Sequence, residues 1–236
     1  MKLESVMVPR DHIVMTQKLQ IDFVSDVACP WCAIGLYGLL EALRRTAGVV
    51  EADLRFQPFE LNPDMVPEGQ NLDEHIGGKY RSSPKQLAEG REMLRSRAAG
   101  VGFAFNSSSK SRVYNTFDAH RLLHWARDKG SQCELKRALF QANFTDDENV
   151  SNPDVLIAAA TRVGLNPIEA REVLEAGRFA KEVRAAEQLW TSRGIHAVPG
   201  VIINGKWLIS GGQPPEIFEQ ALRNIAIEIN SASEMA

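Results

Sequence analysis

The sequence has few cysteines, little net charge and no long hydrophobic segment. Three cysteines in 236 residues are too few for the disulfide framework of a secreted domain. A net charge of −3 supplies no strong positive field, so we expect no nucleic-acid partner. No apolar run approaches the roughly 20 residues that cross a bilayer, so we expect no membrane partner either.

The first residues also lack the continuous apolar segment of a secretory signal, because Lys2, Glu4, Arg10 and Asp11 interrupt them. We therefore expect a cytoplasmic location. With 44% hydrophobic and 24% charged residues, the chain can bury a sizeable core as one domain with an insertion, or as two lobes. Residues 71–194 contain neither an internal repeat nor a low-complexity tract.

Two of the three cysteines stand three residues apart in the motif Cys29-Pro30-Trp31-Cys32. Before the motif, Leu19, Ile21 and Phe23 alternate with polar residues, which predicts a strand. After it, leucines recur at helical intervals, at positions 36, 39, 40 and 43. The first turn of that helix would bring both sulfurs to one side, within reach of a disulfide. This setting favours a disulfide that is made and broken.

The two thiols are expected to have different roles in the reaction. The unpaired N–H groups and the dipole at a helix N-terminus favour a thiolate, so we expect Cys29 to be the nucleophile and Cys32 to resolve the mixed disulfide. Pro30 suits the first helical turn, and Trp31 offers an apolar surface for a substrate.

Other interpretations of the cysteines are weaker. A structural disulfide across so short a loop would stabilise little. A structural zinc site would need two more ligands; His120 and His124 could complete a Cys₂His₂ set, but they lie far along the sequence. Two ordinary buried cysteines are the third alternative. Cys133 has no obvious partner and is expected to be a partly buried apolar residue in a helix.

The order of predicted elements is independent of the motif. A second strand ends at Pro58, and residues 71–194 have helical periodicity with almost no strand signal. Ser83-Pro84, Asn152-Pro153 and Asn166-Pro167 are typical of helix starts, and Gly100, Gly130 and Gly177 of helix ends. We expect about five or six helices in this insertion.

The strands resume near the C-terminus. Residues 201–203 and 207–209 are apolar strands joined by Asn204-Gly205, a strong hairpin signal. A last helix follows Pro214-Pro215, with Ile217, Phe218 and further apolar residues at positions 222, 225 and 229 forming its apolar stripe. The pattern is βαβ, helical insertion, helix, ββα: an α/β thioredoxin fold interrupted by a helical domain. The expected thioredoxin-like domain comprises residues 19–70 and 178–230, and the inserted domain comprises residues 71–177.

Four segments together resemble the FrnE-like branch of the DsbA family. They are residues 21–32 with the cysteine motif, residues 115–122, residues 197–200 and residues 210–215. The resemblance implies a thiol:disulfide oxidoreductase whose motif faces a cis proline, Pro199. In that case Pro199 lies against the two sulfurs, and the backbone of Val198 pairs with an extended substrate.

The resemblance also implies partners and leaves choices open. Protein or small-molecule thiols and disulfides are the expected substrates, with glutathione as an optional co-substrate, no tightly bound cofactor and no metal. The resemblance does not decide whether the chain acts as an oxidase or as a reductase, nor whether it forms a homodimer. No cysteine follows Cys133, so a second redox pair, found in some FrnE-like proteins, is absent.

Two other functions compete with disulfide exchange. Related kappa-class glutathione transferases and chromene-carboxylate isomerases usually carry serine in place of Cys29, so a glutathione-dependent isomerase or transferase acting on a small aromatic or polyketide-like molecule is the main alternative. A peptide-binding chaperone that uses Trp31 is another. His120 and His124 either face a cleft above the cysteines or, more commonly, satisfy local hydrogen bonds. For Asp26 we expect backbone hydrogen bonds at the helix entry.

Overall fold

A computed structural model describes residues 16–66 and 68–234. Lys2, Glu4, Arg10 and Asp11, on which the expectation about a secretory signal rests, lie outside this range.

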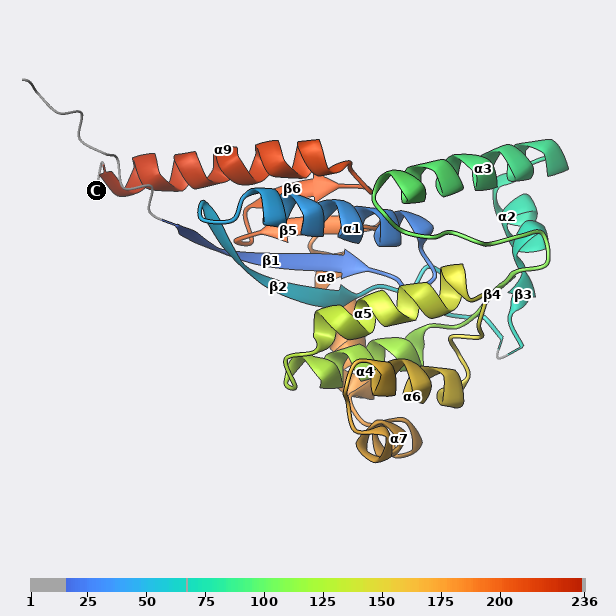
Figure 1. Cartoon of the computed structure of the whole chain (residues 1–236). Coiled ribbons are helices and arrows are strands. Elements are labelled where there is room, and N and C mark those ends of the chain that lie inside the picture. Colours follow the sequence, from blue (N-terminus) through green and yellow to red (C-terminus); the bar gives the residue numbers. More distant parts are fainter. Residues whose placement is uncertain (1–15, 67, 235–236) are drawn as a thin grey trace, which may run out of the picture.

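The centre of the molecule is a four-stranded sheet with the order β2-β1-β5-β6 (Figure 1). The strands are β1 (Gln17–Ser25), β2 (Val50–Pro58), β5 (Gly200–Ile203) and β6 (Trp207–Ser210). β1 runs parallel to β2 and antiparallel to β5, and β6 returns antiparallel to β5 through the turn at Asn204-Gly205. The predicted hairpin and the end of β2 at Pro58 are both confirmed.

Alternating side chains of β1 point to opposite faces of the sheet. Leu19, Ile21 and Phe23 are buried in the core that includes α1 (Pro30–Arg45) and α9 (Pro215–Glu234). Val24 points to the other face, where it packs with Trp190 of α8 (Ala180–Ser192). The sheet is therefore covered on both sides, as the βαβ and ββα order of a thioredoxin fold requires.

Besides α8, six α-helices separate the two halves of the sheet within the described residues. They are α2 (Leu72–Tyr80), α3 (Pro84–Gly100), α4 (Phe117–Arg127), α5 (Gln132–Phe140), α6 (Pro153–Arg162) and α7 (Pro167–Glu175), with a π-helical turn (Gln141–Thr145) extending α5. Ser83, Asn152 and Asn166 cap α3, α6 and α7 by accepting backbone N–H groups, so the three predicted helix starts are confirmed.

The insertion also contains a structure that the sequence did not predict. β3 (Gln70–Asn71) pairs antiparallel with β4 (Arg112–Val113). Strands of two residues are too short to show an alternating pattern.

Besides the small cluster of Val24 and Trp190, two larger apolar cores occupy the described residues. Helices α4 to α7 gather beside β2 (Figure 1) around their own cluster, and Val27 from the loop after β1 is buried in it. Phe103, Phe105, Phe140 and Phe144 instead join the core of the sheet. Apolar packing thus crosses the predicted domain division at residues 71 and 177, which stays a prediction.

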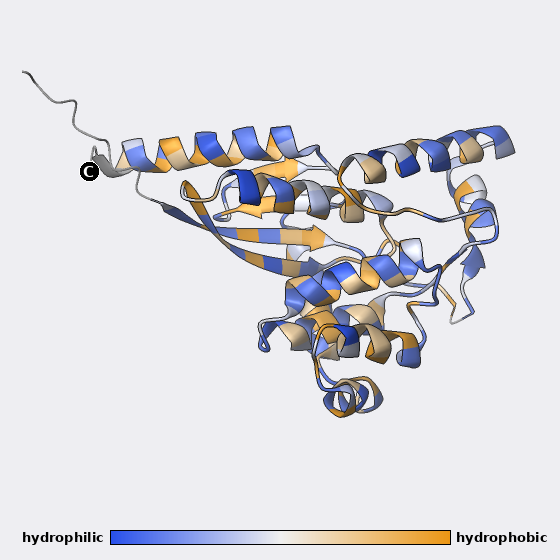
Figure 2. Cartoon of the chain, in the orientation of Figure 1, coloured by the Kyte–Doolittle hydropathy of each residue, from blue (hydrophilic) through white to orange (hydrophobic). Residues whose placement is uncertain are grey.

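The apolar stripe of α9 is narrower than predicted. Phe218, Leu222 and Ile225 are buried, but Ile217 is 45% exposed. Figure 2 shows the alternation of hydrophobic and hydrophilic turns along this helix. The prediction was wrong for Ile217 because adjacent helical residues point about 100° apart, so Phe218 faces the core and Ile217 does not.

Close packing between α1 and the turn before α9 depends on Gly38. A Cβ atom there would lie 2.7 Å from the carbonyl oxygen of Gln213. Gly90 in α3 is a matched control, because a Cβ there meets nothing within 4 Å.

We expect Gly38→Ala to lower the free energy of unfolding by about 1–3 kcal/mol, since backbone must move to admit the methyl group. Gly90→Ala should raise it by about 0.5–1 kcal/mol through helix propensity alone. Urea denaturation of the two variants measures the difference. If Gly38→Ala and Gly90→Ala raised the free energy of unfolding equally, α1 would not approach the turn before α9 this closely.

Candidate active site

The cysteine motif lies where β1 leads into α1. Cys29 is the N-cap residue and Pro30 the first residue of the helix, and the carbonyl of Cys29 accepts the N–H groups of Cys32 at 3.0 Å and Ala33 at 3.3 Å. Both motif cysteines are free thiols. Cys29 is 4% exposed and Cys32 is fully buried, so Cys29 is the more exposed residue of the two.

The loop before β5 closes over Cys29. The Val198–Pro199 peptide bond is cis, as the family resemblance implied. The thiol of Cys29 donates to the carbonyl oxygen of Val198, with sulfur and oxygen 3.7 Å apart. The structure thus brings Cys29 and Val198 together from opposite ends of the sequence.

Trp31, the third residue of the motif, is half-buried. A Cβ atom at Gly212 would lie 2.6 Å from the carbonyl oxygen of Trp31, so only glycine allows the turn after β6 to pack here. Pro30 is also half-buried. Both side chains therefore keep part of their apolar surface beside Cys29.

Asp26, three residues before Cys29, contacts its own loop, the segment after β2 and helix α4. Its carboxylate accepts the N–H of Ala28 at 3.1 Å and that of Leu61 at 2.7 Å. The ring Nε2 of His120 lies 3.6 Å from Oδ1. Burial alone would raise the pKa of Asp26, but His120 and the two backbone N–H groups outweigh it and hold the pKa below its usual value. The expected backbone hydrogen bonds of Asp26 are present.

The contacts of the two candidate histidines, His120 and His124, are with residues other than the cysteines. His120 is buried and its Nε2 lies 3.1 Å from the carbonyl oxygen of Phe59. His124 stacks on the ring of Phe179, and burial lowers its pKa. Within residues 16–66 and 68–234, no three His, Cys, Asp or Glu side chains are grouped as a metal site would require.

The two remaining thiols are both hard to ionise. Burial raises the pKa of Cys32 well above its usual range, and hydrogen bonding to Cys29 raises it further. Burial raises the pKa of Cys133 to about 11. Cys133 is thus poorly suited to redox chemistry at neutral pH, whereas Cys32 must have its thiolate stabilised by neighbouring groups if it is to react.

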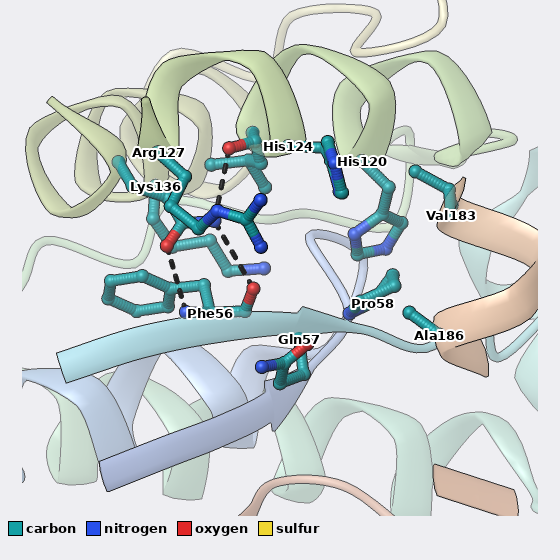
Figure 3. Close-up of a pocket in the computed structure, with 11 residues that line it drawn as sticks. Phe56, Gln57, Pro58, His120, His124, Arg127, Lys136, Val183 and Ala186 are labelled. Carbon is teal, nitrogen blue, oxygen red and sulfur yellow. Dashed lines mark hydrogen bonds between the residues drawn. The ribbon is translucent and has the colours of Figure 1, made fainter. Parts of the chain in front are cut away.

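One charged residue near the motif was missed by the sequence analysis. Lys136 on α5 is 1% exposed and lines a cavity of about 60 Å³ between β2, α4 and α8 (Figure 3). The charge of Lys136 interacts with Cys32, Asp26 and Cys29. Lys136 stands between leucine and arginine in an amphipathic helix, and no sequence signal distinguishes it from a solvent-exposed lysine.

None of the helices that the structure describes is long and apolar enough to span a bilayer.

Comparison with known proteins places the fold and the motif in one family. Residues 20–223 match the model of the DSBA-like thioredoxin domain. A probable DsbA oxidoreductase of Streptomyces coelicolor has a similar structure, with a TM-score of 0.81 and 33% identity over 87% of this chain and 89% of that one.

More distant similarities extend over almost the whole chain. The uncharacterized protein YwbO of Bacillus subtilis is 26% identical over 205 residues, covering 86% of this chain and 96% of that protein. The cytosolic disulfide reductase DsbM of Pseudomonas aeruginosa, solved with glutathione, has a TM-score of 0.60 and 17% identity, covering 87% and 98% of the two chains. At that identity the likeness concerns the fold.

Asp26→Asn tests the carboxylate beneath the motif. The amide would oppose one of the two backbone N–H groups with its own NH₂, so we expect a loss of about 1–3 kcal/mol in the free energy of unfolding at neutral pH. A carboxyl group whose folded pKa is depressed stabilises the fold above its unfolded pKa, near 3.8, and the contribution disappears as the pH falls through the folded value. The difference between wild type and variant should therefore shrink below about pH 4.

Denaturant midpoints measured from neutral to acidic pH provide the check. Asp53→Asn is the control, because Asp53 is exposed and pairs only with Arg55 at the surface among the described residues; we expect a change below about 0.5 kcal/mol. A pH-independent difference for Asp26→Asn would contradict the depressed pKa.

Proposed function

Because the chain belongs to the family of DSBA-like thioredoxin domains, we propose that it is a thiol:disulfide oxidoreductase with Cys29 and Cys32 as its redox pair. The observation that carries the proposal is the position of Cys29. It is the N-cap of α1 and the more exposed cysteine of the motif, and its sulfur lies against the carbonyl of Val198. We place the chain in the FrnE-like branch on the strength of its sequence motifs.

The proposed reaction has two exchanges. The thiolate of Cys29 attacks a substrate disulfide, forming a mixed disulfide and releasing one substrate thiolate. The thiolate of Cys32 then attacks the sulfur of Cys29 and releases the second substrate thiolate, leaving a Cys29–Cys32 disulfide. The substrate gains two electrons and the pair loses two; the same steps in reverse oxidise a dithiol.

The surroundings of Cys29 suit an extended substrate. Once Cys29 is in a mixed disulfide it has no proton to donate, so the carbonyl of Val198 becomes free to accept a substrate N–H. Pro199 follows in the same loop, and Pro30 and Trp31 add half-buried apolar surface. We propose that these four residues contact the substrate, which is a protein or a small molecule carrying a thiol or disulfide.

A cytoplasmic location is part of the proposal. A cytosolic glutathione pool would keep the pair reduced, which favours the reductase direction.

Cys29→Ser should abolish dithiol-dependent reduction of a disulfide substrate, because burial raises the pKa of both remaining thiols, Cys32 and Cys133, and so opposes their ionisation. Cys133→Ser is the matched control and should retain wild-type turnover, since Cys133 lies outside the motif. Insulin reduction followed by turbidity measures both variants. Full activity of Cys29→Ser would overturn the proposal.

Glutathione tests the choice between disulfide exchange and the isomerase or transferase alternative. If glutathione is a co-substrate, reduced Cys32→Ser treated with oxidised glutathione should keep one glutathione per chain on Cys29 and release the other as a thiol. The wild type should release both as thiols and form its internal disulfide. Intact-protein mass spectrometry distinguishes the two products. Glutathione-dependent conversion of a small aromatic substrate that survives loss of Cys32 would instead favour the alternative.

A further inference from the structure

Two carboxyl groups outside the cysteine site each have a buried oxygen without a donor. They belong to Glu60, in the segment after β2, and to Glu187 of α8. Among the residues that the structure describes, only these two side chains have a buried oxygen or nitrogen with no hydrogen-bond partner, and the atom is Oε1 in both. A buried acceptor without a donor is costly, and native structures rarely keep one. A donor for these two oxygens is therefore expected.

Both carboxyl groups are held by one nitrogen atom. Nη1 of Arg184, three residues before Glu187 on α8, donates to Oε2 of Glu187 at 2.8 Å and also to Oε2 of Glu60. The guanidinium carbon of Arg184 lies 3.9 Å from the centre of the Phe117 ring, at the start of α4. Because they share this nitrogen, the two carboxyl groups are neighbours.

The cluster has too little positive charge for two ionised carboxylates. The side chain of Glu60 is 3% exposed and that of Glu187 is 15% exposed. The titratable and charged groups that face Glu60 are Arg184 and Glu187 on α8 and His120 on α4. Burial and then the charge of Glu187 raise the pKa of Glu60 by more than Arg184 and His120 lower it. The protonated form of this carboxyl group is therefore favoured.

We propose that Glu60 and Glu187 share one proton, and that this carboxyl–carboxylate pair is a pH-sensitive contact between the segment after β2 and α8. A single proton turns one of the two unpartnered oxygens into an O–H donor and leaves the other as its acceptor, so it satisfies both. Arg184 balances the negative charge that remains. Loss of the proton leaves two neighbouring negative charges in a buried site, where they repel each other.

The contact adjoins the cysteine motif through the segment that carries Glu60. The carbonyl oxygen of Phe59 lies 3.1 Å from Nε2 of His120, and the N–H of Leu61 donates to the carboxylate of Asp26 at 2.7 Å. Glu60 thus lies between two residues whose backbone contacts α4 and the loop that leads into the motif. A change in the proton content of the pair acts on this segment.

Glu60→Gln imitates the protonated pair at every pH. Its amide oxygen accepts from Arg184 and its NH₂ group donates to Glu187, but it takes up no proton. In the wild type, the pKa of Glu60 in the folded chain lies above its usual value of 4.5. The proton therefore stabilises the fold below that pH, and its contribution is lost as the pH rises through the folded value.

The stability of the wild type should consequently fall relative to that of Glu60→Gln as the pH rises from 4.5. Each unit by which the folded pKa exceeds the usual one corresponds to a loss of about tenfold in the folding equilibrium constant. Urea denaturation of both chains between about pH 4 and pH 8 measures this difference. Both chains retain His120, so its ionisation contributes to both curves.

An ordinary ion pair predicts the opposite sign. If Glu60 were simply ionised and paired with Arg184, Glu60→Gln would lose that pair, and the wild type would gain stability over the variant as the pH rises. Glu169→Gln is the control for this sign, because Glu169 forms an exposed ion pair with Lys129. A rising or constant advantage of the wild type over Glu60→Gln would overturn the shared proton.

Infrared spectroscopy of the carboxyl groups supplies a measurement that does not depend on stability. The wild type should keep the band of one protonated carboxyl group to a higher pH than its exposed carboxyl groups. Glu60→Gln and Glu187→Gln should both lose this band, because the proton belongs to the pair. If the variants do not fold, as circular dichroism would show, the wild-type band decides, and its absence would overturn the proposal. The pair involves neither motif cysteine, so both outcomes leave the proposed function intact.

Discussion

The site depends on one constraint: in the proposed reaction, the sulfur of Cys32 has to become negatively charged, and Cys32 lies where water does not reach. Cys32 is fully buried in the first turn of α1, and both its burial and its neighbour Cys29 oppose ionisation. Such a group can react only if fixed charges and dipoles replace the missing solvent. The helix N-terminus and Lys136 each favour negative charge at this sulfur.

The helical insertion also contributes to the site, because it contacts the loop that leads into the cysteine motif. Val27, two residues before Cys29, is buried in the core of α4 to α7, and its carbonyl accepts a hydrogen bond from Asn143 at 3.1 Å. Asp26 meets His120 of α4. The insertion thus holds the loop that leads into the motif, while the Val198–Pro199 loop contacts Cys29 itself.

The sequence was sufficient wherever a feature depends on local chemistry. Strand alternation before Cys29, the caps at Ser83, Asn152 and Asn166, and the turn at Asn204-Gly205 act within a few residues, and all are present. The cis bond before Pro199 followed only from the family resemblance, because any proline is far more often trans. What the sequence could not supply are contacts between distant segments. Nothing near Lys136 in the chain reveals that α5 buries this lysine, and nothing near Asp26 reveals its hydrogen bond to Leu61.

The most direct test of the central claim is a redox titration of the purified chain against glutathione buffers of graded potential, with disulfides mapped by mass spectrometry after acid quenching. We predict one reversible two-electron transition in which Cys29 and Cys32 join to each other while Cys133 remains a thiol. Failure of Cys29 and Cys32 to form a mutual disulfide at any buffer potential would contradict the assignment of this pair as the redox centre.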